Sequence, residues 1–423
     1  MAARPLPLRR ENGRTIFLRR AGGRYEQFVF TLTGSFFKVS DLGDLKGAHP
    51  FFNNLLTQLN MIPSGDYPDL TKVRRVLVVK LRHHGDVLLC SALFNALKAG
   101  MPLAQIDAYI YTDTLPMLEG HPAIHAFHLY DYSWKRLGLW RRIGREIALL
   151  RAIRARGYDL VINLTEGDRG ALCALFSGAH YRVGSPEGGA GRFKHRLYTH
   201  IVKRPRLPRH MVELNLDAAR RIGIFPEPEQ RDLVFAIPEA ARERVRELLL
   251  EAGSREREFA LLHPTSRWRF KCWPSARVAA LVRELHARGV RVAMSAAPDA
   301  AELAMIDDVL RACADVPVIN LAGRLNLKEL GALIDACRCL ICVDSVPMHM
   351  ASALKRPCVA LFGPSSEIAW GPWLNPDARV VAQNYSCRPC NLDGCGGSKV
   401  SDCLTTLAVE AVLQPTLALL GKA

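Results

Sequence analysis

The stretch LICVDSVPMHMASALKRPCVALFGP, residues 340–364, decides the fold. It begins with a short apolar run that is typical of a buried strand, and it ends with a second such run at residues 358–362. Between them the chain turns at Asp344 and Ser345, either of which suits a helix N-cap. Pro347 then stands near the first position of the predicted helix, where proline is tolerated. The stretch therefore predicts a strand–turn–helix–strand unit of an α/β fold.

The start of this predicted helix is also a candidate binding site. A helix N-terminus presents free N–H groups and the positive end of a dipole, so the turn suits a phosphate group. His349 would lie in the first helical turn and face a ligand bound there. The alternative is an ordinary strand–helix unit with a well-capped helix that binds nothing, and the stretch alone leaves both open.

A second informative stretch is RRVLVVKLRHHGDVLLCSALFNAL, residues 74–97. Its apolar run at 76–81, interrupted only by Lys80, predicts a strand of a parallel sheet covered on both faces. Gly85 allows a tight turn, and Asp86 precedes a helix predicted over Val87–Leu97. A carboxylate at this end of a strand lies where open α/β sheets bind ligands. Asp86 is therefore either a general base or a simple N-cap.

A third stretch, HPTSRWRFKCWP, follows a strand predicted at 259–262. Thr265 and Ser266 offer hydroxyl and N–H groups, and Lys271 with two neighbouring arginines offers positive charge, so the loop could hold a diphosphate. The alternative is a basic loop anchored by its tryptophans. Glu302 comes after the next predicted strand, where it could contact the ribose or the base of a nucleotide.

Length and composition limit the protein class. A chain of 423 residues suggests two domains, and 49% hydrophobic with 23% charged residues is typical of a soluble globular protein. No apolar run reaches 18 residues and the N-terminus lacks the apolar core of a signal peptide, so we expect a cytoplasmic protein. Twelve scattered cysteines favour reduced thiols. A formal charge of +16 points to an anionic partner.

Strands and helices alternate along most of the chain. Residues 1–72 read as a small extension in which 25–32 forms a strand that could pair with 15–18, and 51–59 a short helix. Further strands are predicted at 106–111, 126–130, 160–164, 290–294 and 316–321. We predict a first domain over 73–235, a second over 236–403, and a final helix in 404–423 that packs back on the first domain.

A basic amphipathic helix is predicted between residues 131 and 160. Trp140, Ile143, Ile147 and Leu150 recur at helical spacing among many arginines. Such a helix could lie on an anionic membrane surface. We favour an apolar stripe packed on the sheet, with part of the cationic face serving a membrane or an acceptor.

These stretches together resemble a known family. KLRHHGDVLL, HPTSRWRFKCWP, VDSVPMHMASAL, LFGPS and CRPCNLDGCGGSKVSDCL are similar to sequences of glycosyltransferase family 9, the bacterial ADP-heptose:lipopolysaccharide heptosyltransferases, and most closely to the heptosyltransferase III branch. The resemblance covers residues 73–420. It implies the GT-B fold, in which two Rossmann-like domains face each other across a cleft, here with a small N-terminal extension.

The resemblance also implies roles for single residues. Asp86 matches the proposed catalytic base. Many relatives have Thr-Gly after the aspartate of the donor-binding turn, whereas this chain has Ser345-Val346. Donor binding is implied for Thr265, Ser266, Lys271, Glu302, Asp344, Ser345 and His349, and acceptor or anion binding is expected at Arg82, His83, Arg192 and Lys194.

The implied reaction is an inverting transfer of heptose from ADP-L-glycero-D-manno-heptose. A base must activate the acceptor hydroxyl, and positive groups must neutralise the departing diphosphate. We find no Asp-x-Asp pair placed to hold Mg²⁺, so we expect no cofactor. The acceptor would be the inner core of lipopolysaccharide, with heptose III added to heptose II, at the cytoplasmic face of the inner membrane.

Two other functions are compatible with the residues. The first is a heptosyltransferase acting on protein, which an acceptor assay would distinguish. The second is a non-enzymatic nucleic-acid binder, which predicts a strongly salt-dependent affinity for duplex but leaves Asp86 and the 344–349 turn without purpose.

The C-terminal cysteines are a minor candidate metal site. Four of them lie within 17 residues and could bind zinc or iron tetrahedrally. Relatives that modify autotransporter proteins carry an iron-binding cysteine insertion. The alternative, which we prefer, is a reduced glycine-rich loop. The four residues are Cys387, Cys390, Cys395 and Cys403.

Overall fold

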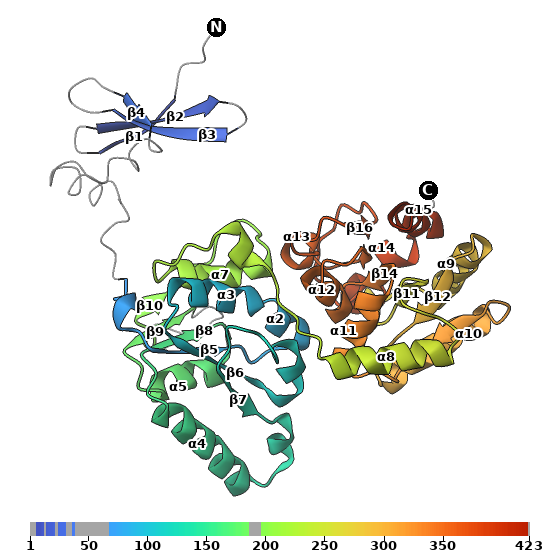
Figure 1. Cartoon of the computed structure of the whole chain (residues 1–423), viewed down its shortest axis with the longest axis horizontal. Helices are drawn as coiled ribbons and strands as arrows, with labels where there is room; N and C mark the ends of the chain where they lie inside the picture. The colour runs from blue at the N-terminus through green and yellow to red at the C-terminus, as the bar shows by residue number, and fades with distance from the viewer. Residues whose placement is uncertain are drawn as a thin grey trace. The chain divides into compact units, whose positions relative to one another are not determined.

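The computed structural model describes residues 67–185 and 196–421, together with the backbone of four strands that precede residue 39 (Figure 1). The chain divides into two units, Met1–Asp66 and Tyr67–Ala423. The boundary between these units, after Asp66, lies close to the end of the N-terminal extension predicted at residue 72. The helix expected at 51–59 lies outside the described residues.

The first unit contains a four-stranded antiparallel sheet in the order β1-β2-β3-β4. The predicted pairing is confirmed, because β2 and β3 pair in antiparallel register from Thr15 opposite Phe30 to Ala21 opposite Arg24. The bounds are β1 Leu6–Glu11, β2 Arg14–Ala21, β3 Arg24–Phe30 and β4 Phe36–Lys38.

The first lobe of the second unit is built on a six-stranded parallel sheet in the order β10-β9-β8-β5-β6-β7. Alternate residues of β5 point to opposite faces, so Val76 and Val78 enter one buried cluster while Leu77 and Val79 enter another. Both faces are therefore covered, as the apolar run predicted. The bounds are β5 Arg75–Val79, β6 Gln105–Tyr111, β7 Ala126–Tyr130, β8 Leu160–Asn163, β9 Tyr181–Gly184 and β10 His200–Ile201.

Helices cover the two faces of this sheet (Figure 1). The single helix predicted at Val87–Leu97 is wrong, because two helices occupy this segment. The last turn of α2 tightens, with the N–H of Cys90 donating to the carbonyl of Val87 at 3.2 Å, and a new helix begins at Ser91. The bounds are α2 His84–Leu88, α3 Ser91–Gly100, α4 Leu139–Ala155, α5 Asp168–Phe176 and α7 Met211–Arg220.

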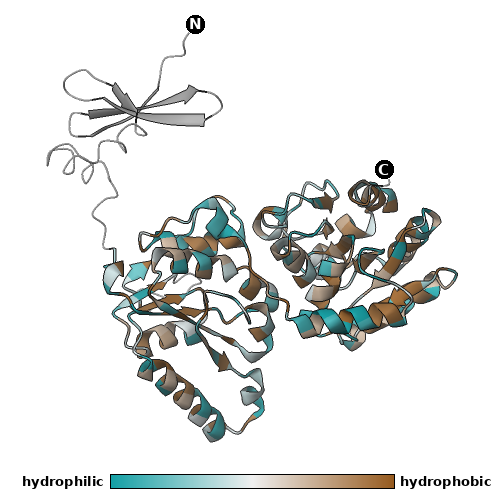
Figure 2. Ribbon diagram, in the orientation of Figure 1, coloured by the Kyte–Doolittle hydropathy of each residue, from teal (hydrophilic) through white to brown (hydrophobic). Residues whose placement is uncertain are grey.

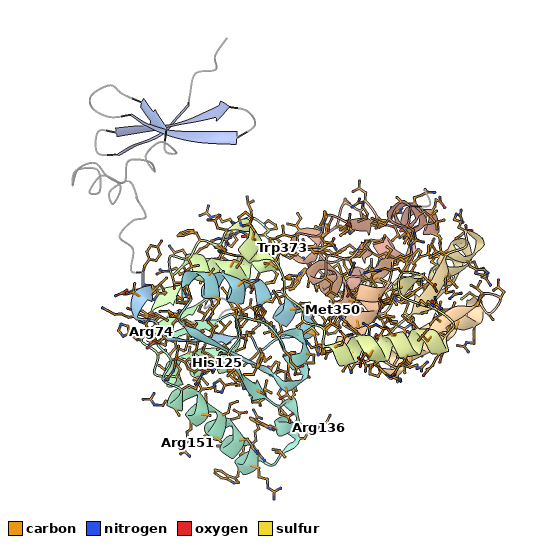
Figure 3. All side chains as sticks on the ribbon, viewed as in Figure 1. Arg74, His125, Arg136, Arg151, Met350 and Trp373 are labelled. Carbon is orange, nitrogen blue, oxygen red and sulfur yellow. The ribbon has the colours of Figure 1, made fainter. Side chains whose placement is uncertain are left out.

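Helix α4 corrects the prediction that its apolar stripe packs on the sheet. Ile153 is buried, but Trp140 is 82% exposed and Ile143 and Ile147 are exposed as well. The chain leaves β7 through the 3₁₀ helix η4, Tyr132–Arg136, and only the second half of α4 lies over the sheet. Arg136 and Arg151 project outward from this region (Figure 3). An amphipathic, half-covered helix therefore remains on the surface.

The second lobe repeats the design with a parallel sheet in the order β13-β12-β11-β14-β15-β16. In β11, Leu261 and Leu262 belong to different buried clusters, so this sheet is also covered on both faces. Apolar residues are concentrated in the strands (Figure 2). The strands are β11 Phe259–His263, β12 Arg291–Met294, β13 Val318–Asn320, β14 Cys339–Val343, β15 Cys358–Phe362 and β16 Ala378–Ala382, and the helices are α8 Glu239–Glu251, α9 Ser275–Ala287, α10 Ala300–Ala312, α11 Leu327–Ala336, α12 Val346–Ala353, α13 Glu367–Trp370, α14 Asp402–Thr405 and α15 Val409–Leu419.

The C-terminal helix α15 packs on the second lobe, and the expectation that it returns to the first domain is wrong. Val412, Leu413 and Leu417 are buried in the cluster that covers one face of the second sheet. The indole N–H of Trp273 donates to the carbonyl of Leu407 at 3.1 Å just before this helix. Burial of the apolar face of α15 beside α9 explains why this helix packs on the second lobe.

The two lobes are in direct contact. The ammonium of Lys328 on α11 donates to the carbonyls of Glu119 and Ala236 at 2.9 and 2.7 Å. A Cβ added at Gly85 on α2 would lie 3.1 Å from Cδ2 of His349 on α12, so the two helices approach closely there. None of the described helices has the length and apolar character needed to cross a bilayer.

Candidate active site

Asp86 faces a cavity that both lobes line. The side chain is half-buried on α2, directly beyond the carboxyl end of β5. The cavity has a volume of about 430 Å³, and Trp370 from α13 of the second lobe contributes to its wall. The carboxylate therefore lies where an acceptor held by the first lobe could meet a group held by the second.

Lys80 is a site residue that our sequence analysis did not assign. It is only 4% exposed, its Nζ lies 4.0 Å from Oδ1 of Asp86, and it donates to Oδ1 of Asn215 at 3.4 Å. Burial lowers the pKa of Lys80, and the charge of Asp86 opposes that effect. A lysine interrupting an otherwise apolar buried strand was the available signal, because a buried ammonium requires partners.

The predicted acceptor residues separate into three groups. Arg82 lines the Asp86 cavity and donates to Glu166 at 2.9 Å, so its charge is already paired. His83 is exposed at the N-cap position of α2 and does not line this cavity. Arg192 and Lys194 lie outside the described residues.

The turn at 344–345 is arranged much as predicted. Ser345 occupies the N-cap position of α12, and Pro347 lies at its start. The hydroxyl of Ser345 donates to the carbonyl of Val343 at 3.2 Å and does not cap the helix. The N-terminal amide groups of α12 are therefore not covered by the side chain of the N-cap residue, which leaves this end available to an anion.

Lys271 is brought to the same turn by the neighbouring strand. Strands β11 and β14 pair in parallel, so the loops after them meet at one edge of the sheet. The ammonium of Lys271 donates to Oδ2 of Asp344 at 2.6 Å, and the carboxylate is only 6% exposed. Lys271 is thus part of a largely buried ion pair instead of a free point charge. A diphosphate would have to compete with Asp344 for it.

Thr265 and Glu302 form a second pair at this edge. The hydroxyl of Thr265 donates to Oε2 of Glu302 at 2.7 Å, and the same oxygen accepts the N–H of Ala297 at 3.3 Å. These bonds link the loops after β11 and β12. Ser266 is half-buried, and its hydroxyl oxygen accepts the N–H of Trp268 at 3.3 Å. The structure brings these residues together, and their contact with a donor stays a prediction.

His349 is neutral and buried at the junction of the lobes. Burial lowers its pKa from 6.5 to about 4, although the nearby Asp344 opposes this. Its Nδ1 is buried and has no hydrogen-bond partner among the described residues. A buried nitrogen without a partner is costly, so a ligand at the start of α12 would gain a ready partner here.

Known proteins share these sequence features over most of the chain. Residues 147–400 match the family model described as glycosyltransferase family 9 (heptosyltransferase). The chain is also 34% identical over 306 residues to lipopolysaccharide heptosyltransferase 3 of Escherichia coli, covering 72% of this chain and 88% of that relative. The chain belongs to glycosyltransferase family 9. It is therefore a transferase enzyme.

Solved structures of family 9 proteins share the fold of this glycosyltransferase. A family 9 glycosyltransferase from Veillonella parvula superimposes with a TM-score of 0.71 at 23% identity, covering 85% of this chain and 100% of that one. The ADP-heptose lipopolysaccharide heptosyltransferase II of E. coli gives a TM-score of 0.66 at 25% identity, covering 82% and 99%. The predicted GT-B architecture of two Rossmann-like lobes is thereby confirmed.

The C-terminal cysteines of the family 9 enzyme do not assemble as a metal site. Cys387, Cys390, Cys395 and Cys403 all line a cavity of about 110 Å³, and each is a free thiol. Within residues 67–185 and 196–421, no three or more His, Cys, Asp or Glu side chains are grouped so that they could hold a metal ion. The tetrahedral arrangement that the metal hypothesis requires is therefore not found there.

Three buried histidines predict that the enzyme loses stability on mild acidification. Burial lowers the pKa of His121, His263 and His349 from 6.5 to about 4. Between these values the unfolded chain binds protons that the folded protein does not, so the free energy of unfolding falls as the pH drops through this window. Once the unfolded chain is protonated and the folded protein is not, each pKa shift lowers the free energy of unfolding by up to about 3 kcal/mol. The melting temperature should accordingly fall between about pH 6.5 and 4.5.

A pair of variants tests this origin. His263→Asn should flatten the pH dependence of the melting temperature, whereas the exposed His286→Asn should leave it unchanged. An identical slope in His263→Asn and the unmodified enzyme would show that His263 does not contribute to the effect.

Proposed function

We propose that this glycosyltransferase transfers heptose from ADP-L-glycero-D-manno-heptose to the inner core of lipopolysaccharide, and specifically adds heptose III to heptose II. The observation that carries the proposal is Asp86, which lies in a cavity between the lobes on a chain that is 34% identical to a lipopolysaccharide heptosyltransferase 3 over 88% of that relative. The ADP-heptose donor is supported by the resemblance in fold to the ADP-heptose lipopolysaccharide heptosyltransferase II of E. coli.

In the proposed mechanism, Asp86 accepts the proton of the acceptor hydroxyl. The acceptor oxygen forms a bond to the anomeric carbon while the bond from that carbon to the diphosphate breaks, which inverts the configuration. Lys271 and the N-terminus of α12 stabilise the charge that develops on the departing ADP. These groups supply positive charge without a cofactor, so we propose a metal-independent reaction.

Lys80 is best assigned to positioning Asp86. Its ammonium is held between the carboxylate and the amide of Asn215, which in turn donates to the carbonyl of Leu89 at 3.0 Å. A buried cation with these partners restricts where the carboxylate can lie. The base is thereby oriented toward the cavity before the acceptor arrives.

Product analysis tests the proposed function. The purified enzyme is incubated with ADP-heptose and core oligosaccharides truncated after heptose I, after heptose II or beyond it, and products are identified by mass spectrometry and linkage analysis. We expect one added heptose on heptose II and none on the acceptor that ends at heptose I. Transfer to a protein acceptor alone, or turnover with another nucleotide sugar in preference to ADP-heptose, would contradict the proposal.

We further propose that the enzyme works at the cytoplasmic face of the inner membrane and contacts anionic phospholipid through α4 and α5. Trp140, Ile143 and Ile147 of α4 are exposed, as are Leu172 and Phe176 of α5, which packs beside α4. Exposed arginines flank this surface, so apolar and cationic groups are combined as binding to an anionic bilayer requires. These arginines are Arg141, Arg145 and Arg151.

Vesicle binding tests the membrane proposal. The enzyme should bind vesicles that contain phosphatidylglycerol, with a shift of tryptophan fluorescence to shorter wavelength, and should bind pure phosphatidylcholine vesicles much more weakly. Trp140→Glu should weaken binding about tenfold or more. The matched control is Leu250→Glu, which alters a similarly exposed apolar residue on α8. Equal binding by both variants, or no binding by the unmodified enzyme, would rule out this surface.

A further inference from the structure

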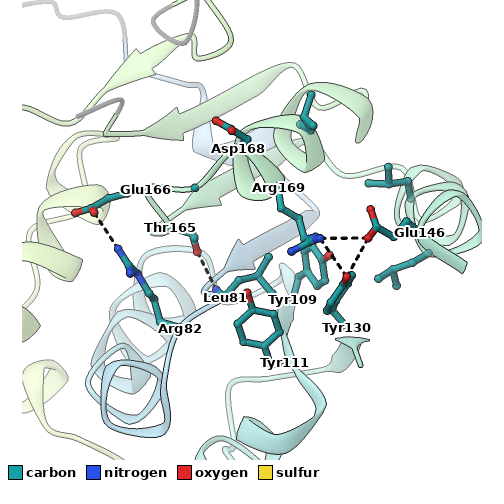
Figure 4. Close-up of a pocket in the computed structure, with 14 residues that line it drawn as sticks. Leu81, Arg82, Tyr109, Tyr111, Tyr130, Glu146, Thr165, Glu166, Asp168 and Arg169 are labelled. Carbon is teal, nitrogen blue, oxygen red and sulfur yellow. Dashed lines mark hydrogen bonds and ion pairs between the residues drawn. The ribbon is translucent and has the colours of Figure 1, made fainter. Parts of the chain in front are cut away.

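A large cavity in the first lobe lies beside the Asp86 cavity. Its volume is about 690 Å³, within the range of roughly 300–1,000 Å³ that is usual for small-ligand sites. It lies at the carboxyl ends of the first-lobe strands, under the inner face of α4 (Figure 4). Arg82, Thr165 and Glu166 line both cavities, so a single extended ligand could occupy the two together.

Three tyrosines line the cavity, but Tyr109 is only 2% exposed and Tyr130 is fully buried, so Tyr111 is the tyrosine that a ligand could touch. Tyr109 and Tyr111 come from β6 and Tyr130 from β7. The rings of Tyr111 and Tyr130 are 5.8 Å apart between centroids and inclined at 67°, an edge-to-face contact that holds the Tyr111 ring in place. Burial raises the pKa of Tyr109 far above its usual value, so its hydroxyl stays neutral. The partly exposed ring of Tyr111 suits the C–H face of a sugar ring.

Two ion pairs, each between an arginine and a glutamate, join four of the charged side chains that line the cavity. Arg169 donates to Oε1 of Glu146 at 3.2 Å and lies 4.1 Å from the ring centroid of Tyr130, whose hydroxyl donates to the same oxygen at 2.9 Å (Figure 4). Arg82 is likewise paired with Glu166. A phosphate would have to displace these carboxylates and then lie near them, which is unfavourable. The paired carboxylates retain lone pairs that can accept sugar hydroxyls.

We propose that this cavity binds a neutral sugar residue of the acceptor, next to the residue that receives the heptose. The inference rests on the proposed function, because it takes the acceptor to be an oligosaccharide. It assigns recognition of an uncharged part of the acceptor to Tyr111 and its neighbours, and it separates that recognition from the basic surface around α4. The phosphate groups of an acceptor would then be bound elsewhere.

The test measures binding without turnover. Isothermal titration calorimetry of the full chain with dephosphorylated inner-core oligosaccharide should detect binding that Tyr111→Ala weakens about tenfold. Tyr111→Phe should bind nearly as the unmodified enzyme does, because the ring remains. Leu172→Trp, at a 44% exposed position on the cavity rim, should also weaken binding by filling the space. Tyr385→Ala in the second lobe is the control.

The outcomes separate this inference from the proposed function. In transfer assays, Tyr111→Ala should raise KM for the extended acceptor about tenfold and leave both KM for ADP-heptose and kcat at saturating acceptor unchanged. Undiminished binding in Tyr111→Ala and Leu172→Trp, binding that requires phosphate groups, or no binding at all would overturn the inference. Binding through this cavity without heptose transfer would instead retain the inference and reject the proposed function.

Discussion

Replacing Asp86 by asparagine should lower kcat about a thousandfold while leaving the affinity for ADP-heptose nearly unchanged. The amide has the same shape but cannot accept the acceptor proton, and a positioned general base contributes about 10²–10⁴ in rate. The carboxylate lies in a cavity that Trp370 of the second lobe also lines, where the acceptor and the donor can meet. Single-turnover rates and donor titration by calorimetry measure the two quantities separately.

The matched control for this variant is Asp377→Asn, which alters an exposed aspartate of the second lobe. It should retain full activity. Lys80→Met should lower kcat less than Asp86→Asn does and should alter the pH profile of kcat, because it changes the environment of the base without removing it. Near-normal turnover by Asp86→Asn would refute the role of this residue as the base.

Replacing Lys271 by methionine should lower kcat/KM for the donor about 10²–10³-fold, the usual effect of removing one group that stabilises developing negative charge. It should also destabilise the fold, since Asp344 would remain largely buried without its ion-pair partner at 2.6 Å. The double variant Lys271→Met/Asp344→Asn should recover the melting temperature but not the activity. That difference separates the catalytic effect from the structural one.

Lys399→Met supplies the control for Lys271→Met. Lys399 forms an ion pair of 2.5 Å with Asp393, but both side chains are more than half exposed. Its loss should change stability and donor kinetics little, because exposed ion pairs contribute only about 0–1 kcal/mol. Full activity in the double variant would show that Lys271 serves the fold alone.

Local sequence pattern predicted the strands well. The apolar runs at 340–343 and 358–362 are central strands of the second sheet, and the run that begins at Val76 is the core of the first. These strands could be predicted because a strand of a parallel sheet that is covered on both sides must be apolar on both faces. The turn at Asp344 could be predicted equally well, since N-cap and proline preferences act over a few adjacent residues.

Other features could not be predicted from the sequence, because they depend on which segments contact one another in the folded protein. The helix predicted at Val87–Leu97 breaks after α2, although most of its residues are apolar. The apolar stripe of α4 and that of α15 look equally suited to burial, yet Trp140 is exposed whereas Leu413 is buried. Periodicity shows that a helix has an apolar face, but only the position of the sheet decides whether that face is covered.

The sequence by itself determined the α/β class, the strand-end loops and the identity of the family, because these follow from short-range pattern and from residues near one another in the chain. Tertiary structure alone decided that Lys80 bonds to Asn215, that Lys271 pairs with Asp344, and that tyrosines from neighbouring strands line a cavity. The physical reason is that charge pairing and enclosure are set by distances between residues far apart in sequence, and these distances are established only when the strands take their order in the sheet.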